Sequence, residues 1–118
     1  MTSTYSWLRL RQFVYEALHN SEFAQLDDIS LRLLDWVVVQ NSRSDAPLYM
    51  QSLVLRANVA SPATIYKSVS KLMDQRMIEV TVDPEDTRRR IVRPSPTALK
   101  LIDRLGSRTD TWVKSLQH

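Results

Sequence analysis

Residues 61–76 most constrain what this chain can fold into, because they combine a strong helix start with a helical apolar pattern. Ser61 can accept a hydrogen bond from a free N–H group of a first turn, and Pro62 suits the next position, where its missing N–H costs nothing. Apolar side chains then recur at helical spacing, at Ile65, Val69, Leu72 and Met73. The segment is predicted to be a helix with one buried face.

The opposite face of this predicted helix carries short polar and cationic side chains, namely Thr64, Lys67, Ser68 and Lys71. Side chains of this kind fit into a DNA major groove and hydrogen-bond to base edges. Two interpretations follow from this segment alone. It is either a DNA recognition helix or an ordinary amphipathic surface helix whose lysines are solvated.

The segment before it favours the first interpretation. Residues 48–57 predict a short helix that buries Met50, Leu53, Val54 and Ala57, and only residues 58–60 separate it from Ser61. Two short helices joined by three or four residues make a helix-turn-helix. Asn58 tolerates a left-handed backbone, so we expect it to replace the glycine that is usual in such a turn.

The segment after it predicts a β-hairpin. Residues 77–82 alternate apolar and polar side chains, residues 83–87 are rich in turn-forming types, and residues 88–93 read as a returning strand. That strand carries four arginines, Arg88, Arg89, Arg90 and Arg93. A basic hairpin directly after a recognition helix is typical of a wing that reaches the flanking minor groove or the phosphates.

Further helices are predicted at both ends of the chain. Residues 5–18 are amphipathic, and residues 28–41 follow two aspartates, Asp27 and Asp28, which favour the positive end of a helix. The middle of the second helix is apolar nearly all round, although its three consecutive valines leave a strand as the alternative. Ser95 and Pro96 repeat the cap-and-proline start and open a long C-terminal helix, in which Gly106 is expected to mark a bend or a break.

Composition limits the classes of protein. A chain of 118 residues suits one domain with a core, 1–118, divided into N-terminal helices (1–47), helix-turn-helix and wing (48–94) and C-terminal helix (95–118). Residues 1–47 hold four basic and six acidic side chains, a net charge of −2, whereas residues 48–118 hold twelve and seven, a net charge of +5. Such asymmetry suggests that the second half faces a polyanion.

Other chemistry finds no support in the residue types. There are no cysteines, so disulfides, thiolate metal sites and thiol switches are excluded, and a cytoplasmic location is expected. No run approaches the roughly 20 apolar residues of a membrane span. The only histidines, His19 and His118, are not at metal-ligand spacing, and a single glycine excludes a phosphate-cradling loop. We therefore predict no enzyme activity, no metal and no cofactor.

Residues 49–105 resemble the winged-helix core of the MarR family of transcription regulators. The matching segments are the capped helix at Ser61–Leu72 and the turn at Asp83–Arg90, in which Asp86 precedes Arg88 by two positions as in the family's wing signature. The sequence departs from the family after the wing, where Pro94-Ser95 and Ala98 replace a Leu-Thr pair and a glycine. The resemblance implies a mostly α fold with a small β-hairpin wing, a winged helix-turn-helix with flanking dimerisation helices.

The residues and the resemblance together predict a DNA-binding transcription regulator, a repressor that binds a pseudo-palindromic operator in double-stranded DNA. Asp86 is expected to hold the wing turn or to orient an arginine. The predicted DNA contacts are Arg56, Ser61, Ala63, Thr64, Lys67, Ser68, Lys71, Arg88, Arg89 and Arg90. The alternatives are a winged-helix plasmid or phage replication or partition factor, and a winged-helix protein–protein interaction module.

A homodimer is also predicted, because the two ends of the chain offer more apolar side chains than a small winged domain needs for its own core. The expected interface residues are Trp7, Leu10, Val14, Trp112, Val113 and Leu116. A small-molecule effector is left open, and no residue pattern identifies one.

Overall fold

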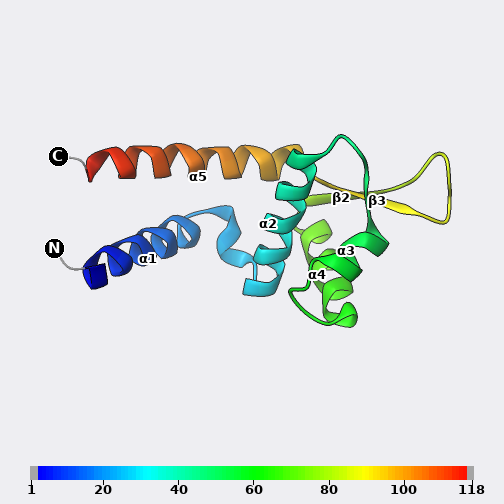
Figure 1. Ribbon diagram of the computed structural model, residues 1–118, viewed down its shortest axis with the longest axis horizontal. Helices are drawn as coiled ribbons and strands as arrows, with labels where there is room; N and C mark the ends of the chain where they lie inside the picture. The colour runs from blue at the N-terminus through cyan, green and yellow to red at the C-terminus, as the bar shows by residue number, and fades with distance from the viewer. Residues whose placement is uncertain (1–2, 117–118) are drawn as a thin grey trace.

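The computed structural model describes residues 3–116, which form five α-helices, a short 3-10 helix and a three-stranded antiparallel sheet (Figure 1). The predicted fold class, mostly helical with a β-hairpin wing, is confirmed. Helices α1 and α5 extend together from one end of the molecule, and the hairpin forms the other end (Figure 1). His118 lies outside the described residues.

The N-terminal part contains α1 (Ser3–His19), η1 (Glu22–Gln25) and α2 (Asp28–Arg43). Asp27 caps α2, because its carboxylate accepts hydrogen bonds from Ser30 N at 3.2 Å and from Ser30 Oγ at 2.7 Å. The three valines are helical, so the strand alternative is wrong. Leu33, Leu34 and Val37 are fully buried, as expected for a helix covered on several sides.

The helix-turn-helix consists of α3 (Met50–Arg56) and α4 (Pro62–Asp74), and Asn58 in the turn has a left-handed φ of 51°, as predicted. The expected helix at 48–57 is wrong in its first two residues, which form strand β1 (Leu48–Tyr49). This strand exists because Leu48 and Tyr49 pair with Val92 and Ile91, more than forty residues later in the chain.

Helix α4 ends in a tight turn that the residue types do not predict. Arg76 has a φ of 59°, and its N–H donates to the carbonyl of Met73 at 2.9 Å, while Met77 N–H donates to the carbonyl of Leu72 at 2.8 Å. These two bonds form a Schellman motif, a helix end in which glycine usually occupies the left-handed position. An arginine occupies it here.

The wing is the hairpin of β2 (Ile78–Val82) and β3 (Arg90–Pro94), and the sheet order is β1-β3-β2. Val92 of β3 has Val80 and Leu48 as its partners on either side. Only two of the four arginines predicted on the returning strand, Arg90 and Arg93, lie in it. Arg88 and Arg89 belong to the turn.

Helix α5 (Pro96–Ser115) begins at a Ser95 cap and shows no break at Gly106. Ser95 Oγ accepts from Ala98 N–H at 3.0 Å and donates to the carbonyl of Arg76 at 2.7 Å, so the cap also ties α5 to the end of α4. No helix within residues 3–116 is long and apolar enough to cross a membrane. The core lies between α2, α3, α4, the sheet and the first turns of α5, and its centre is formed by Leu33, Leu34, Leu53, Ile65, Leu72 and Val92.

Candidate nucleic-acid interface

The start of α4 is fixed by Ser61. Its hydroxyl accepts from Thr64 N–H at 3.4 Å and lies 3.1 Å from Thr64 Oγ1, to which it donates. Thr64 is half-buried and its hydroxyl is already engaged, whereas Ser61 and Ala63 are exposed. The N-terminal turn therefore presents short side chains to solvent.

The prediction that Ser68 contacts DNA is wrong. Ser68 is 2% exposed, on the face of α4 that also buries Ile65, Val69 and Leu72. At about 100° per residue, position 68 falls one turn after Ile65 and one turn before Leu72, so its side chain points into the fold. The residue type of Ser68 suggests the outer face, whereas its angular position on the helix places it on the buried face.

The outer face of α4 instead includes Tyr66 and Ser70, which the sequence analysis missed. Both are exposed, as are Ala63 and Lys67 between the same turns. Positions 63, 66, 67 and 70 are three and four residues apart and lie opposite the buried stripe. This spacing alone is enough to predict that Tyr66 and Ser70 lie on the outer face of α4.

The cations around α4 differ in their partners. Lys71 Nζ lies 3.4 Å from Asp27 Oδ1, and the Arg56 guanidinium lies 5.9 Å from the centroid of the Trp36 ring. Hydrogen bonds from Ser30, and then Lys71, lower the pKa of the Asp27 carboxyl to about 2 against the opposing effect of burial. Within residues 3–116 no carboxylate pairs with Lys67, so it is the α4 cation most available to a ligand.

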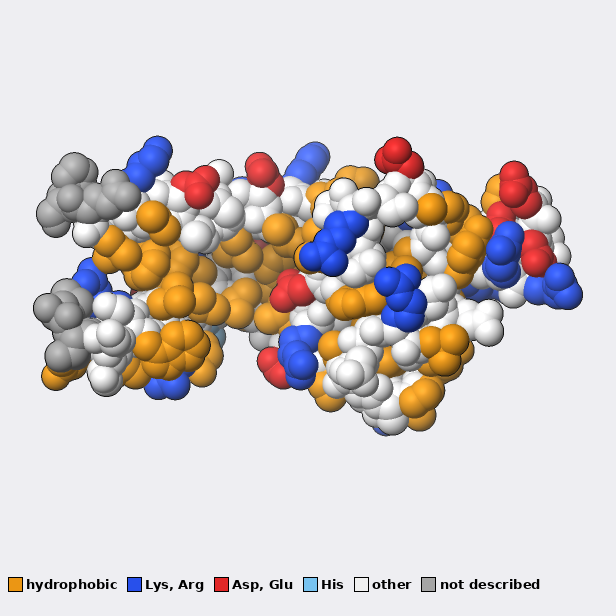
Figure 2. Space-filling model, in the orientation of Figure 1, with side chains coloured by type: hydrophobic (Ala, Val, Ile, Leu, Met, Phe, Trp, Pro, Cys, Tyr) orange, Lys and Arg blue, Asp and Glu red, His pale blue; other side chains and the backbone are white. Residues whose placement is uncertain are grey.

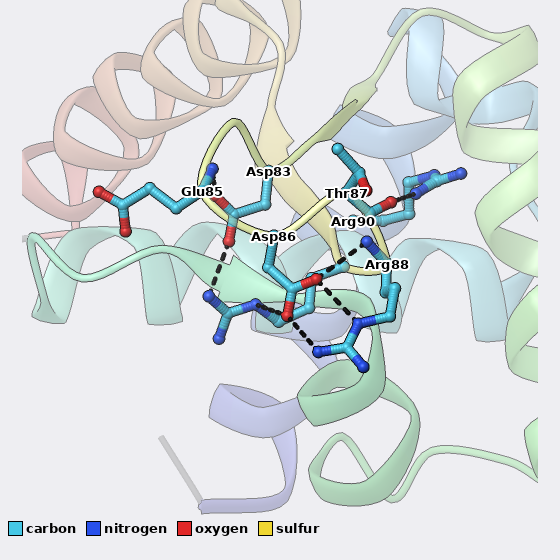
Figure 3. A network of polar contacts seen from close by, with 7 residues as sticks. Asp83, Glu85, Asp86, Thr87, Arg88 and Arg90 are labelled. Atoms are coloured by element: carbon cyan, nitrogen blue, oxygen red, sulfur yellow. Dashed lines mark hydrogen bonds and ion pairs between the residues drawn. The ribbon is translucent and has the colours of Figure 1, made fainter.

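The wing turn is organised by Asp86 (Figure 3). Its Oδ1 accepts from the Arg88 backbone N–H and from Arg88 Nε, both at 3.1 Å, and its Oδ2 accepts from Arg88 Nη2 at 3.3 Å. These bonds to Arg88, and the nearby charge of Arg89, hold the pKa of the Asp86 carboxyl below its usual value. Asp86 thus both closes the turn and orients Arg88, whose side chain is 88% exposed.

The other two wing arginines point to different partners. Arg90 Nη1 donates to the carbonyl of Thr87 at 3.0 Å, next to Arg88 (Figure 3). Arg89 turns inward, where its Nη2 lies 2.9 Å from Asp83 Oδ2 and its guanidinium lies 4.3 Å from the centroid of the Tyr49 ring. Its side chain is 42% exposed, half the value of Arg88.

The wing and the helix-turn-helix enclose a cleft of about 670 Å³. Arginines form one wall, and hydroxyl, amide and aromatic side chains of α3 and α4 form the other. The lining residues are Tyr49, Met50, Gln51, Ser52, Tyr66, Thr87, Arg88, Arg89 and Arg90. The structure therefore brings the wing arginines and Tyr66 of α4 to one cleft. Ser68 is buried, Arg56 contacts Trp36, and Lys71 contacts Asp27.

Solved structures of transcription regulators share this fold. The S. aureus MepR–DNA complex matches with a TM-score of 0.74 at 15% identity, over 98% of this chain and 90% of that one. MarR matches with a TM-score of 0.60 at 18% identity, over 98% and 81%. The fold is that of the MarR-family regulators. PcaV from Streptomyces coelicolor matches with a TM-score of 0.57 at 22% identity, over 94% and 77%.

The likeness to the MarR fold is one of structure. No protein-family model matches the sequence, and no curated protein is similar to it in sequence. The match covers nearly the whole chain, so α1 and α5 are part of the shared architecture as well as the winged core. Within residues 3–116 no group of His, Asp and Glu side chains is arranged to hold a metal ion.

The predicted interface residues lie at the other end of the MarR fold. Trp7, Leu10 and Val14 of α1 are 58%, 39% and 41% exposed, and Val113 and Leu116 near the end of α5 are 44% and 41% exposed. Trp112 is half-buried, because its ring stacks on Phe13 of α1 at a centroid distance of 4.7 Å. Hydrophobic side chains gather over α1 and the facing part of α5 (Figure 2).

Proposed function

We propose that this chain is a transcription regulator that binds double-stranded DNA as a homodimer and represses by occupying a pseudo-palindromic operator. The observation that carries the proposal is the cleft between the wing and the helix-turn-helix, which is lined by the wing arginines, by residues 49–52 and by Tyr66 of the outer face of α4. A duplex offers two features at matching positions, a major groove for a helix and a flanking backbone and minor groove for a wing.

In this pose α4 enters the major groove. Lys67 reaches guanine O6 or N7, Tyr66 and Ser70 lie beside it, and Ser61 and Ala63 allow the first turn to approach the bases closely. Arg88 and Arg90 of the wing meet phosphates or the flanking minor groove. The net charge of +5 on residues 48–118 attracts the polyanion to this half of the chain.

The MepR structure supports the pose, since that protein has the same fold and is bound to DNA. PcaV, which shares the fold, is a transcriptional regulator, and this supports a regulatory role. A regulator with a single recognition helix needs a second copy to read enough sequence, and a two-fold dimer reads a pseudo-palindrome.

The dimer is proposed to form through α1 and the end of α5. Their exposed apolar side chains lie away from the cleft, so a second copy bound there leaves the DNA-facing side open (Figures 1 and 2). Repression then follows from occupancy, because a bound dimer excludes the polymerase from the same stretch of duplex.

The test is a gel-shift against genomic fragments flanking the chain's own gene, followed by selection of a tight-binding duplex. Lys67→Ala should cost roughly 1–3 kcal/mol on that duplex and much less on random sequence, because base edges differ between sequences and phosphates do not. Arg88→Ala should weaken both duplexes alike, with the salt slope falling by about one unit.

Two outcomes would overturn the proposal. If neither substitution changes the affinity for any duplex, the fold is used for a protein partner instead. If the selected site lies in a replication origin or partition site and not near a promoter, the DNA contacts stand but the regulatory role does not.

A further inference from the structure

Three consecutive arginines leave the wing turn in three different directions, which their sequence positions do not explain. Arg88 is held by Asp86 and its side chain is 88% exposed. Arg90 is bonded to the carbonyl of Thr87 at the rim of the cleft. Arg89 lies between Asp83, at the start of the turn, and Tyr49 of strand β1, with less than half of its side chain exposed.

The partner of Arg89 at the start of the wing turn is a buried carboxylate. The Asp83 side chain is 5% exposed, and its Oδ1 accepts from Glu85 N–H at 2.9 Å. Its Oδ2 is buried and has no aligned hydrogen bond within the described residues, and Arg89 Nη2 lies 2.9 Å from it as an ion-pair partner. A buried carboxylate requires a compensating cation, so the position of Arg89 is dictated from inside the fold.

The partner on the other side is an aromatic ring from a distant part of the chain. Tyr49 lies 4.3 Å from the Arg89 guanidinium, a distance suited to a cation–π contact. Tyr49 is also the last residue of β1 and directly precedes α3, and it is the register partner of Ile91. Arg89 therefore connects the hairpin turn to the residue at which the helix-turn-helix begins.

This connection bears on the part of the wing that lacks sheet pairing. The β2–β3 ladder ends at Val82 and Arg90, so the residues between them are held by the turn alone. Two backbone bonds link Asp83 with Arg89 and Arg89 with Asp86, at 3.1 and 2.9 Å, and Arg89 Nε lies 3.7 Å from Asp86 Oδ2. The pairing of β1 with β3 ties the strand to the start of α3 as far as Ile91, and the contact of Arg89 with Tyr49 extends this tie to the turn.

We propose that Arg89 is a positioning residue and not a DNA contact. With Asp83 and Tyr49 it forms a clasp that sets the separation between the wing turn and the helix-turn-helix, so that Arg88 meets the DNA while α4 occupies the major groove. The clasp rests on the proposed function, because the separation matters only if one ligand spans both elements. The positive charge of Arg89 is compensated by Asp83 and Asp86, so it contributes little to the attraction of phosphates.

Asp83→Asn should change the DNA affinity in opposite directions depending on whether Arg89 positions the wing or contacts DNA directly. Asp83→Asn removes a negative charge from a DNA-binding surface, so simple electrostatics predicts tighter binding. If Asp83 acts by holding Arg89, the same change releases the wing and weakens binding. Tyr49→Leu gives a second test, because it removes the ring without changing any charge and leaves the Asp83–Arg89 ion pair in place.

The experiment measures affinity for a duplex selected by the unaltered protein, together with hydroxyl-radical footprints and melting temperature. Tyr49→Leu and Asp83→Asn should each weaken binding by roughly five- to thirty-fold, which corresponds to the cation–π range of about 1–2 kcal/mol. The footprint should lose its protected flank, contacted by the wing, and keep its centre, contacted by α4. A purely structural role would lower the melting temperature and weaken both parts of the footprint alike.

Matched controls separate the alternatives. Tyr49→Phe keeps the ring, and Glu85→Gln makes the same charge change as Asp83→Asn at an exposed position of the same turn, so both should bind at least as tightly as the unaltered protein. If Asp83→Asn does not fold, the comparison of Tyr49→Leu with Tyr49→Phe decides. Tighter binding by Asp83→Asn, or equal binding by the two Tyr49 variants, overturns the clasp. Failure of the unaltered protein to select any duplex overturns the proposed function and the clasp with it.

Discussion

The two ends of this molecule treat their apolar side chains in opposite ways. In the winged part, defined as α2 through Leu101, residues such as Leu33, Leu34 and Leu53 are fully buried. In the terminal arm, defined as α1 and residues 106–116, only Ala17 is buried among the described residues, while Trp7, Leu10 and Val113 are exposed. One end completes its core within a single chain, and the other presents an apolar surface that a single chain leaves open.

The shape of the molecule reflects the same difference. Its extents are 55 × 26 × 23 Å and its radius of gyration is 16.4 Å, whereas a compact chain of this length has about 13.5 Å. The arm accounts for the excess, because it extends beyond the core and its helices meet through the stacked rings of Phe13 and Trp112 (Figure 1). Elongation of this kind separates a surface suited to a second copy from a surface suited to DNA.

The largest expected effect is on association through the arm. Trp7→Ser combined with Val113→Ser should weaken the proposed dimer roughly a thousand-fold, or by about 4 kcal/mol, since each copy loses two apolar side chains that the dimer would bury. Sedimentation at micromolar concentration measures it. Val82→Ser, an apolar residue of the wing that is 48% exposed, is the control and should leave the dimer intact. A monomeric unaltered protein, or a dimer that survives the double change, contradicts the comparison.

The next largest effect is on the free energy of unfolding, and it should arise only from substitutions in the winged part. Leu34→Ala removes a side chain with no solvent exposure and should lower the free energy of unfolding by about 3 kcal/mol, through lost burial and the cavity that remains. Urea denaturation measures it. Leu10→Ala, made in the dimer-deficient background, should cost less than about 1 kcal/mol, because a half-exposed side chain leaves no closed cavity. Equal losses would mean that the arm and the winged part share one core.

The start of α5, which lies within the winged part, gives a smaller effect. Ser95→Ala removes the cap of α5 and leaves the Arg76 carbonyl without its buried donor, so the free energy of unfolding should fall by about 1–2 kcal/mol. Ser61→Ala is the matched control, because its cap bond is 3.4 Å long and exposed to water. It should cost about half as much. The reverse order would show that the Ser95 bonds to Ala98 and to the end of α4 are not where α5 gains its stability.

The smallest effect is the acid sensitivity of Asp27, which links the start of α2 to Lys71. Its pKa in the folded chain is about 2, below the ordinary 3.8, so the stabilisation is present above pH 4 and is lost as the pH falls from about 4 to 2. The side chain is 43% exposed, and solvent screening limits the amount to below about 1 kcal/mol. Thermal melts of Asp27→Asn should show less acid dependence in this window, and Asp28→Asn should match the unaltered protein. Identical profiles for all three would contradict the assignment.

Local chemistry in the sequence was enough to predict most of the fold. Among the α-helices within residues 3–116, three begin at a capping side chain that accepts from a backbone N–H three residues later, Asp27 for α2, Ser61 for α4 and Ser95 for α5. The left-handed turn at Asn58 and the hairpin after α4 depend on their own residue types in the same way. Hydrogen bonds between residues close in sequence do not depend on the tertiary fold, so they can be predicted from the order of residues.

The candidate site could be predicted only in outline, because its details depend on residues far apart in the chain. Strand β1 exists through its pairing with β3, and Lys71 meets Asp27 across 44 positions. The polarity of Ser68 predicts an outward orientation, but packing against the core buries its side chain, and Tyr66, for which the sequence predicts no face, is exposed. Arg88, Arg89 and Arg90 cannot be told apart by residue type. Their separate directions are decided by Asp83, Asp86 and Tyr49, because a buried carboxylate and an aromatic ring select among identical cations only once folding has brought them within contact distance.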